Sequence, residues 1–188
     1  MKKNILLSAI LFGLMILPQS AMGQGFLNKI AKKLAKTDEK TEITAKPIEQ
    51  ENGIVVINPL AKSVDVELVG AYGTSTSTNF GNVELVLKVN VKIPESKISF
   101  GGNAGSKGTM AFDEEGNVYK MVYPSVSSKF DVVEGMVMRI ALKENDAFQK
   151  VPKAALVFPV VKLFTHLNYD VRDEIIFKNV PVLWDVEH

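Results

Sequence analysis

Hydrophobic and polar side chains alternate along most of the chain after residue 53. The clearest case is residues 83–93, where six apolar residues at odd positions oppose mostly polar ones at even positions. Residues 64–68 and 136–142 repeat this period of two. Such alternation is typical of strands in an antiparallel sheet that buries one face. The pattern therefore predicts a β-sheet protein.

Weaker runs of the same kind continue the pattern. They lie at residues 107–112, 117–122, 155–158, 161–167 and 173–184. Turn-forming Gly, Asn and Asp residues separate the runs, as in residues 80–82, 113–117 and 168–170. This spacing predicts an all-β fold, which we interpret as an immunoglobulin-like antiparallel β-sandwich of about 7–9 strands over residues 54–188. Beyond Leu34, only a possible turn near residues 144–148 suggests helix.

Residues 1–23 have the pattern of a secretory signal peptide. Two lysines precede an apolar run over residues 5–17, and Pro18 ends it. Small residues at Ala21 and Gly23 fit a signal peptidase site. The apolar run is shorter than the roughly 20 residues that a membrane span needs. We therefore expect cleavage after Gly23 and an extracytoplasmic location, in the periplasm, on the cell surface or secreted.

Residues 24–53 are predicted to form an amphipathic helix followed by a polar tether. The helix, residues 25–36, has an apolar stripe opposite a row of lysines. Two interpretations are open, since this helix can contact an anionic membrane or a partner, or pack on its own domain. The residues for membrane contact are Phe26, Leu27, Lys29, Ile30, Lys33 and Leu34. Residues 37–53 are too polar to bury a core and read as the tether.

Charge and composition exclude several classes of protein. The chain has 22 Lys and Arg against 21 Asp and Glu, so losing Lys2 and Lys3 with the signal peptide leaves it close to neutral. A nucleic-acid partner is therefore not expected, because phosphate binding needs a basic excess. Without cysteine the chain has no disulfide, no thiol nucleophile and no lipoprotein attachment site. We predict no cofactor and no metal, and the oligomeric state stays open.

Catalytic groups are scarce as well. The two histidines are His166, expected to face solvent, and His188, expected to be mobile. One usable histidine without cysteine cannot build an ordinary zinc site. The acidic run at residues 113–117 offers oxygen ligands for calcium, but it is also typical of a hairpin turn. We expect no enzyme activity and no catalytic residue.

A run of hydroxyl residues between two aromatics is the candidate for partner binding. Its members are Tyr72, Thr74, Ser75, Thr76, Ser77, Asn79 and Phe80. Hydroxyls can bond to a sugar or a partner chain while the aromatic faces stack. The same composition also suits a flexible connection between strands. Near the other end, Trp184 is expected to anchor the last strand, and Pro181 indicates an edge strand or a bulge.

Two phrases give a resemblance to a known family. Residues 111–119, with Asp113, Gly116 and Tyr119 in a D-x-x-G-x-x-Y hairpin, resemble bacterial secreted immunoglobulin-like domains of unknown function. Residues 176–184 look like the closing strand of some relatives of those domains. The resemblance implies an extracytoplasmic binding or accessory module, and it brings no catalytic residues.

Three functions are therefore open. The leading hypothesis is an exported, non-enzymatic module that binds a protein or glycan partner. The alternative is a β-barrel or cupped sandwich that carries an apolar small ligand among its many Val, Leu and Met side chains. The third hypothesis, an extracytoplasmic hydrolase, would use the acids near Asp170.

Overall fold

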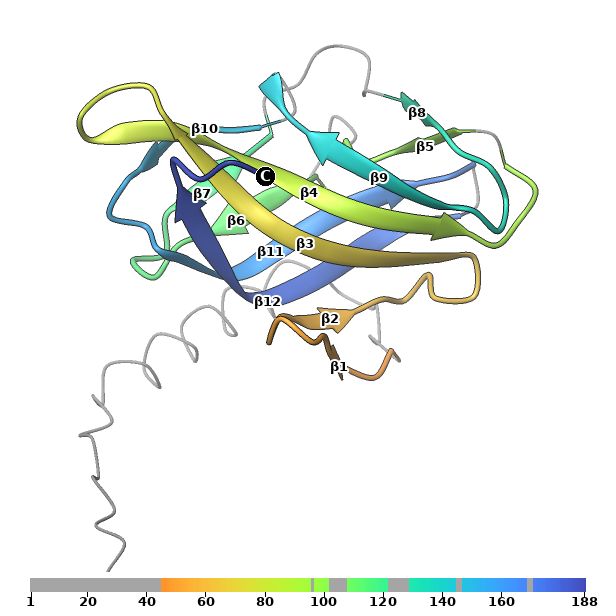
Figure 1. Ribbon diagram of the computed structural model, residues 1–188. Coiled ribbons are helices and arrows are strands. Elements are labelled where there is room, and N and C mark those ends of the chain that lie inside the picture. Colours follow the sequence, from red (N-terminus) through yellow and green to blue (C-terminus); the bar gives the residue numbers. More distant parts are fainter. Residues whose placement is uncertain (1–44, 96, 102–107, 122–128, 145–146, 169–170) are drawn as a thin grey trace, which may run out of the picture. The chain divides into compact units, whose positions relative to one another are not determined.

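The computed structural model describes residues 45–95, 97–101, 108–121, 129–144, 147–168 and 171–188 (Figure 1). Within these ranges the chain forms twelve strands and no α-helix. The predicted all-β class is confirmed. The predicted signal peptide, amphipathic helix and first part of the tether lie outside the described residues. The end of the tether is described, and it contains a short strand.

The strands are short at the chain's beginning and middle and long in two hairpins. In order they are β1 (Ile48–Glu49), β2 (Val55–Ile57), β3 (Val64–Ser75), β4 (Phe80–Val91), β5 (Lys97–Ser99), β6 (Met110–Phe112), β7 (Val118–Lys120), β8 (Lys129–Asp131), β9 (Val137–Leu142), β10 (Phe148–Pro152), β11 (Val157–His166) and β12 (Arg172–Trp184). They form a mixed sheet, because β12 pairs in parallel with β3 while the other described pairs are antiparallel.

The strand order follows from four long strands. The path through the sheet is β10-β4-β3-β12-β11-β5-β8. Strand β4 pairs with β10 near its start and with β9 further along, on the edge away from β3. Strand β11 pairs with β12 on one edge and with β6 and β5 on the other. The hairpins β3–β4 and β11–β12 are visible as the long ribbons in Figure 1.

Strand β12 joins the two hairpins by changing neighbours along one edge. Residues Ile176–Lys178 pair with β2, and residues Val182–Trp184 pair with β3. Between them, Asn179 has a φ of 57°, a left-handed conformation that asparagine tolerates better than most residues. Pro181 also lies in this gap, where the edge needs no backbone donor. The sequence-based expectation of an edge or bulge at Pro181 fits this position.

The core lies between the inward faces of both hairpins. Alternate residues of β3 from Val64 to Leu68 are buried, and a register shift between Leu68 and Gly70 then brings Ala71 into the core. Aromatic rings also fill the core: Phe148 of β10 and Phe158 of β11 pack edge to face with centroids 5.9 Å apart. Burying one such ring contributes about 1.5–3 kcal/mol.

Some elements differ from the sequence-based expectation. Phe148, at the end of the possible helical turn, begins β10, and its ring is buried. The two predicted runs 155–158 and 161–167 merge into one strand, β11. The strands β1, β2, β5, β8 and β10 were not predicted, whereas the equally short β6 and β7 lie within longer alternating runs.

The indole ring of Trp184 packs on two glycines. A methyl group at Gly73 would lie 2.6 Å from Trp184 Cδ2, and one at Gly81 would lie 2.5 Å from Cζ3 and would also overlap the carbonyl oxygen of Thr74. The indole Nε1 donates to the carbonyl of Ala155 at 3.1 Å. The ring packs against the hydrophobic core, so the expected anchoring of the last strand is confirmed.

Replacing either glycine should destabilise the fold, and a smaller side chain at Trp184 should relieve the two substitutions to different extents. Gly73→Ala and Gly81→Ala should each lower the free energy of unfolding by about 1–3 kcal/mol, because the methyl group overpacks a filled site. Trp184→Leu should relieve Gly73→Ala in a double-mutant cycle. It should relieve Gly81→Ala less, because the Thr74 carbonyl stays in place. Urea unfolding measures the three single and two double variants, and Thr74→Ala, at an exposed side chain, is the control. Additive effects in both cycles would contradict this packing.

Candidate functional site

The predicted hydroxyl run is partly strand, and the Ser75, Thr76 and Ser77 hydroxyls bond within the chain. Tyr72, Thr74 and Ser75 belong to β3 and Phe80 to β4, so only residues 76–79 form the connection. The Thr76 and Ser77 hydroxyls both approach the Phe80 carbonyl oxygen, at 3.2 and 3.4 Å. The backbone carbonyl of Asn79 accepts from Lys153 N–H at 2.9 Å. Thr74, the connecting residues 76–79 and the Phe80 ring, which is 46% exposed, all lie at the surface of this hairpin.

Asp185 fastens the end of β12 to the same hairpin. Its carboxylate accepts from the N–H and the hydroxyl of Ser75, at 2.9 and 2.7 Å, and from Lys153 Nζ at 3.2 Å. The backbone N–H of Asp185 donates to the Gly73 carbonyl at 2.7 Å. These hydrogen bonds, first from the Ser75 hydroxyl and N–H and then from Lys153, lower the pKa of the Asp185 carboxyl from 3.8 to about 2.

The hydrogen bonds of Asp185 should contribute less to stability in acid. Because the pKa of Asp185 is lowered in the folded protein, its contribution to stability is present above the ordinary value of 3.8 and is lost as the pH falls toward about 2. The difference in unfolding free energy between wild type and Asp185→Asn should therefore shrink over that window. Urea unfolding at a series of pH values measures it. Ser75→Ala should reduce the size of the difference, and a difference that persists unchanged at pH 2 would contradict the assignment.

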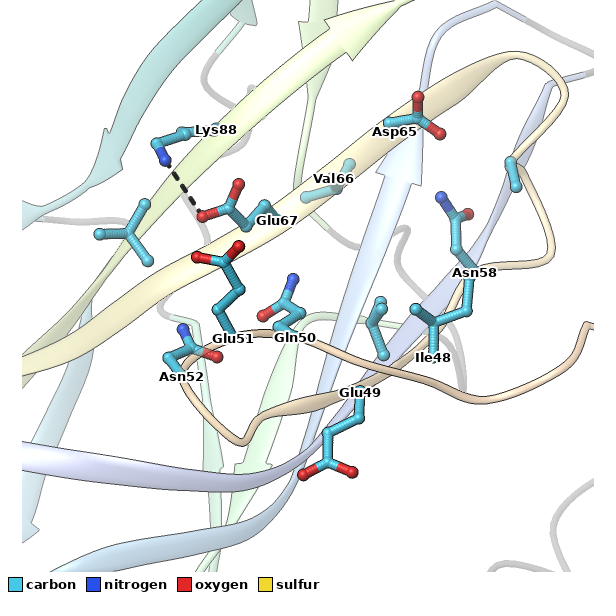
Figure 2. Close-up of a pocket in the computed structure, with 13 residues that line it drawn as sticks. Ile48, Glu49, Gln50, Glu51, Asn52, Asn58, Asp65, Val66, Glu67 and Lys88 are labelled. Carbon is cyan, nitrogen blue, oxygen red and sulfur yellow. Dashed lines mark hydrogen bonds and ion pairs between the residues drawn. The ribbon is translucent and has the colours of Figure 1, made fainter.

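A groove lies between the β1–β2 hairpin and the outer face of β3 (Figure 2). Its volume is about 680 Å³, within the range of small-ligand sites. The lining residues are Ile48, Glu49, Gln50, Glu51, Asn52, Val56, Asn58, Ala61, Asp65, Val66, Glu67, Val69 and Lys88. Carboxylate and amide groups therefore surround an aliphatic floor. The lining contains no aromatic side chain among the described residues.

Two asparagine side chains connect the groove to the edge of β3. Asn52 Nδ2 donates to the Leu68 carbonyl at 3.0 Å, and Asn58 Nδ2 donates to the Val64 carbonyl at 2.8 Å. Both carbonyls lie on the edge of β3 that no described strand covers between residues 64 and 69. The side-chain amides thus stand where a neighbouring strand would bond, which keeps this edge from pairing with another chain.

The groove is acidic on one side. Glu67 pairs with Lys88 at 3.1 Å and Asp65 with Lys92 at 2.8 Å, all of them substantially exposed. Glu49 and Glu51 are exposed and have no ion-pair partner among the described residues. In Figure 2 the Glu51 side chain points toward Glu67 across the groove. The side-chain oxygen of Gln50 is shielded from solvent and has no hydrogen-bond partner in the described part of the chain.

This groove was not predicted from the sequence, because its residues fall in the predicted tether, in two predicted strands and in the connection between residues 56 and 61. The dipeptide Asn52-Gly53 was the available indication. It is a common turn sequence between strands, and Gly53 has a φ of +79° that favours glycine. It connects β1 to β2, and Ile48 and Glu49 pair with Val56 and Val55.

The acidic run at residues 113–117 is a tightly bonded turn between β6 and β7. The Asp113 carboxylate is buried and accepts from the N–H groups of Glu115 and Asn117, from the Asn117 amide and from the Tyr119 hydroxyl, the last at 2.6 Å. Burial raises the pKa of Asp113, but these bonds outweigh it and the net pKa is lowered. Burial, and then the bond to Asp113, raise the pKa of Tyr119. The Asp113 carboxylate already accepts four hydrogen bonds, so it is not free to bind calcium without losing them.

Removing the Tyr119 hydroxyl, which bonds to this turn, should therefore lower the stability of the fold. Tyr119→Phe should lower the free energy of unfolding by about 1.5 kcal/mol, because it takes away a hydrogen bond to a buried carboxylate. Glu114→Gln, in the same turn but outside the bonded network, should change it by less than about 0.5 kcal/mol. Urea unfolding measures both. Calcium and a chelator should give the same unfolding curves, and stabilisation by calcium would contradict this account of Asp113.

The histidines are placed differently from the expectation. His166 is half-buried rather than facing solvent, and its Nε2 is shielded without a hydrogen-bond partner among the described residues. His188 stacks on Tyr72 and contacts Glu84. Within the described ranges, no three His, Asp or Glu side chains are grouped as a metal site. The described part of the chain contains no helix long and apolar enough to cross a membrane.

Comparison with known proteins adds no relative. No family model matches the chain, no curated protein matches its sequence, and no solved structure matches its fold. The resemblance to secreted immunoglobulin-like domains therefore stays a prediction.

Proposed function

We propose that the protein is an exported, non-enzymatic binding module that holds a segment of a partner protein in the groove beside β3. The single observation that carries this proposal is the groove itself, with about 680 Å³ of volume and a polar rim. The export part of the proposal is supported by the signal-peptide pattern of residues 1–23.

The proposed architecture is an immunoglobulin-like β-sandwich that is antiparallel except where β12 pairs with β3. Supporting it, the ladders fall into one group around β3 and β4 and another around β11 and β12, and β12 pairs with strands of both. Their inward side chains contribute to one hydrophobic cluster. In this architecture the groove lies at the seam between the groups, where β2 pairs with β12 and where residues 64–69 of β3 have no described strand on the edge away from β4.

The chemistry of the groove supports binding rather than turnover. Its lining offers carboxylates, amides and one lysine around Val56, Val66 and Val69. Such a mixture suits an extended segment with polar and aliphatic side chains, since the rim can hydrogen-bond while the floor packs. A glycan is less favoured, because sugar rings stack on aromatic faces and the described lining has none.

A charge reversal in the groove tests the proposal. Glu51→Lys should weaken binding of the purified protein to its best ligands from a peptide array by about tenfold or more, because it places a cation where a carboxylate faces the ligand. Glu114→Lys makes the same charge change on the distant β6–β7 turn and should leave binding unchanged. Peptide binding unaffected by Glu51→Lys, or hydrolytic turnover abolished by a single substitution, would contradict the proposed function.

A further inference from the structure

Tyr72 lies flat on the outer surface of the β3–β4 hairpin. A methyl group at Gly70 would lie 2.9 Å from Tyr72 Cε2 and 3.0 Å from its hydroxyl oxygen, so the ring covers that glycine. Glu84 is directly opposite Tyr72 in the antiparallel register. The hairpin therefore presents an aromatic face beside a carboxylate. We call Tyr72 and Glu84 the ring platform.

The chain itself supplies the group that occupies this platform. The His188 imidazole stacks on the Tyr72 ring with centroids 3.9 Å apart and planes 9° apart. Its Nε2 is in contact with the Glu84 carboxylate. Both side chains are largely covered, with exposed fractions of 23% for His188 and 19% for Glu84. A planar nitrogen ring thus satisfies the face and the carboxylate together.

The residues that carry His188 are held weakly compared with the residue before them. Asp185 is fixed by its bonds to Ser75, Lys153 and the Gly73 carbonyl. Residues 186–188 make no backbone hydrogen bond to another strand in the described part of the chain. The stack and the contact with Glu84 hold His188 in place, so the imidazole can leave while Asp185 and β12 stay where they are.

We propose that the ring platform recognises an arginine side chain of a partner protein, and that His188 fills this site in the free protein. A guanidinium is planar, so it stacks on a tyrosine face, and its N–H groups reach an adjacent carboxylate in the same orientation. An ammonium has no flat face to stack. The site consists of one ring and one carboxylate, so it offers few contacts to a free small molecule and suits a side chain presented by a larger partner.

Displacement of His188 by an arginine probe tests the inference in the full chain. In NMR spectra, the His188 ring protons should be shifted upfield by the Tyr72 ring. They should move back toward free-peptide positions when N-acetyl-arginine amide is added. N-acetyl-lysine amide should bind about two- to fivefold more weakly, which is the contribution expected for planar stacking at an exposed site.

Three variants separate the parts of the site. His188→Ala should bind the arginine probe more tightly than wild type, because no internal group competes for the platform. Glu84→Gln should weaken probe binding about two- to fivefold. Tyr72→Leu should abolish both the upfield shift and the probe response. Glu67→Gln, the same chemical change on the same hairpin but at the Lys88 ion pair, should leave probe binding unchanged.

Two results would contradict recognition of arginine at the ring platform. The inference is overturned if the His188 protons do not respond to the arginine probe and the probe causes no shift at Tyr72 in His188→Ala. Equal binding of the arginine and lysine probes would overturn the guanidinium preference. The Glu84→Gln variant keeps the test valid even if Tyr72→Leu does not fold. These outcomes do not depend on the groove, which the Glu51→Lys experiment tests separately.

Discussion

Strand β12 changes its pairing partner from β2 to β3 within a few residues. Most of the structure depends on the contacts that stabilise this change. The strand stays paired with β11 up to Pro181, so one edge is continuous while the other edge changes partner. Asn179 absorbs the change in a left-handed conformation. Trp184 then fixes the new pairing, because its ring fits only where Gly73 and Gly81 lack side chains. A backbone irregularity and an aromatic anchor together connect the two hairpins.

The same change leaves an edge of β3 without a strand, and this explains the groove. Because β12 meets β3 only at residues 71–73, residues 64–69 would expose an unpaired edge. Asn52 and Asn58 place amide donors on two of its carbonyls and so replace part of a missing strand. Side chains bridge a wider gap than a paired strand does, and the groove occupies that space. Protection of the edge and formation of the groove are thus one feature.

The sequence predicted the long elements and missed the short ones for a physical reason. A half-buried strand repeats its pattern over many residues, so alternation predicted β4, the first part of β3 and, more weakly, β12. Strands of two or three residues, such as β1 and β5, carry no period and form because longer neighbours offer a partner. The hydroxyl run was identified as a feature, but residue type does not reveal that Ser75 and Thr76 bond within the chain. The groove depends on contacts between residues 52 and 68, which no local pattern contains.

The ring platform shows how the end of β12 can serve both folding and recognition. Up to Asp185, side chains and backbone bond to the β3–β4 hairpin at several points, so this part is needed to hold the two hairpins together. Beyond Asp185 the contacts involve one ring and one carboxylate, and losing them leaves the core untouched. A segment fixed at one end and loosely held at the other keeps its occupant close to the site. The internal imidazole therefore competes at high effective concentration, so a free arginine probe must be added in large excess, and a natural partner must add further contacts to displace it. A guanidinium backed by further contacts of a protein surface meets that requirement.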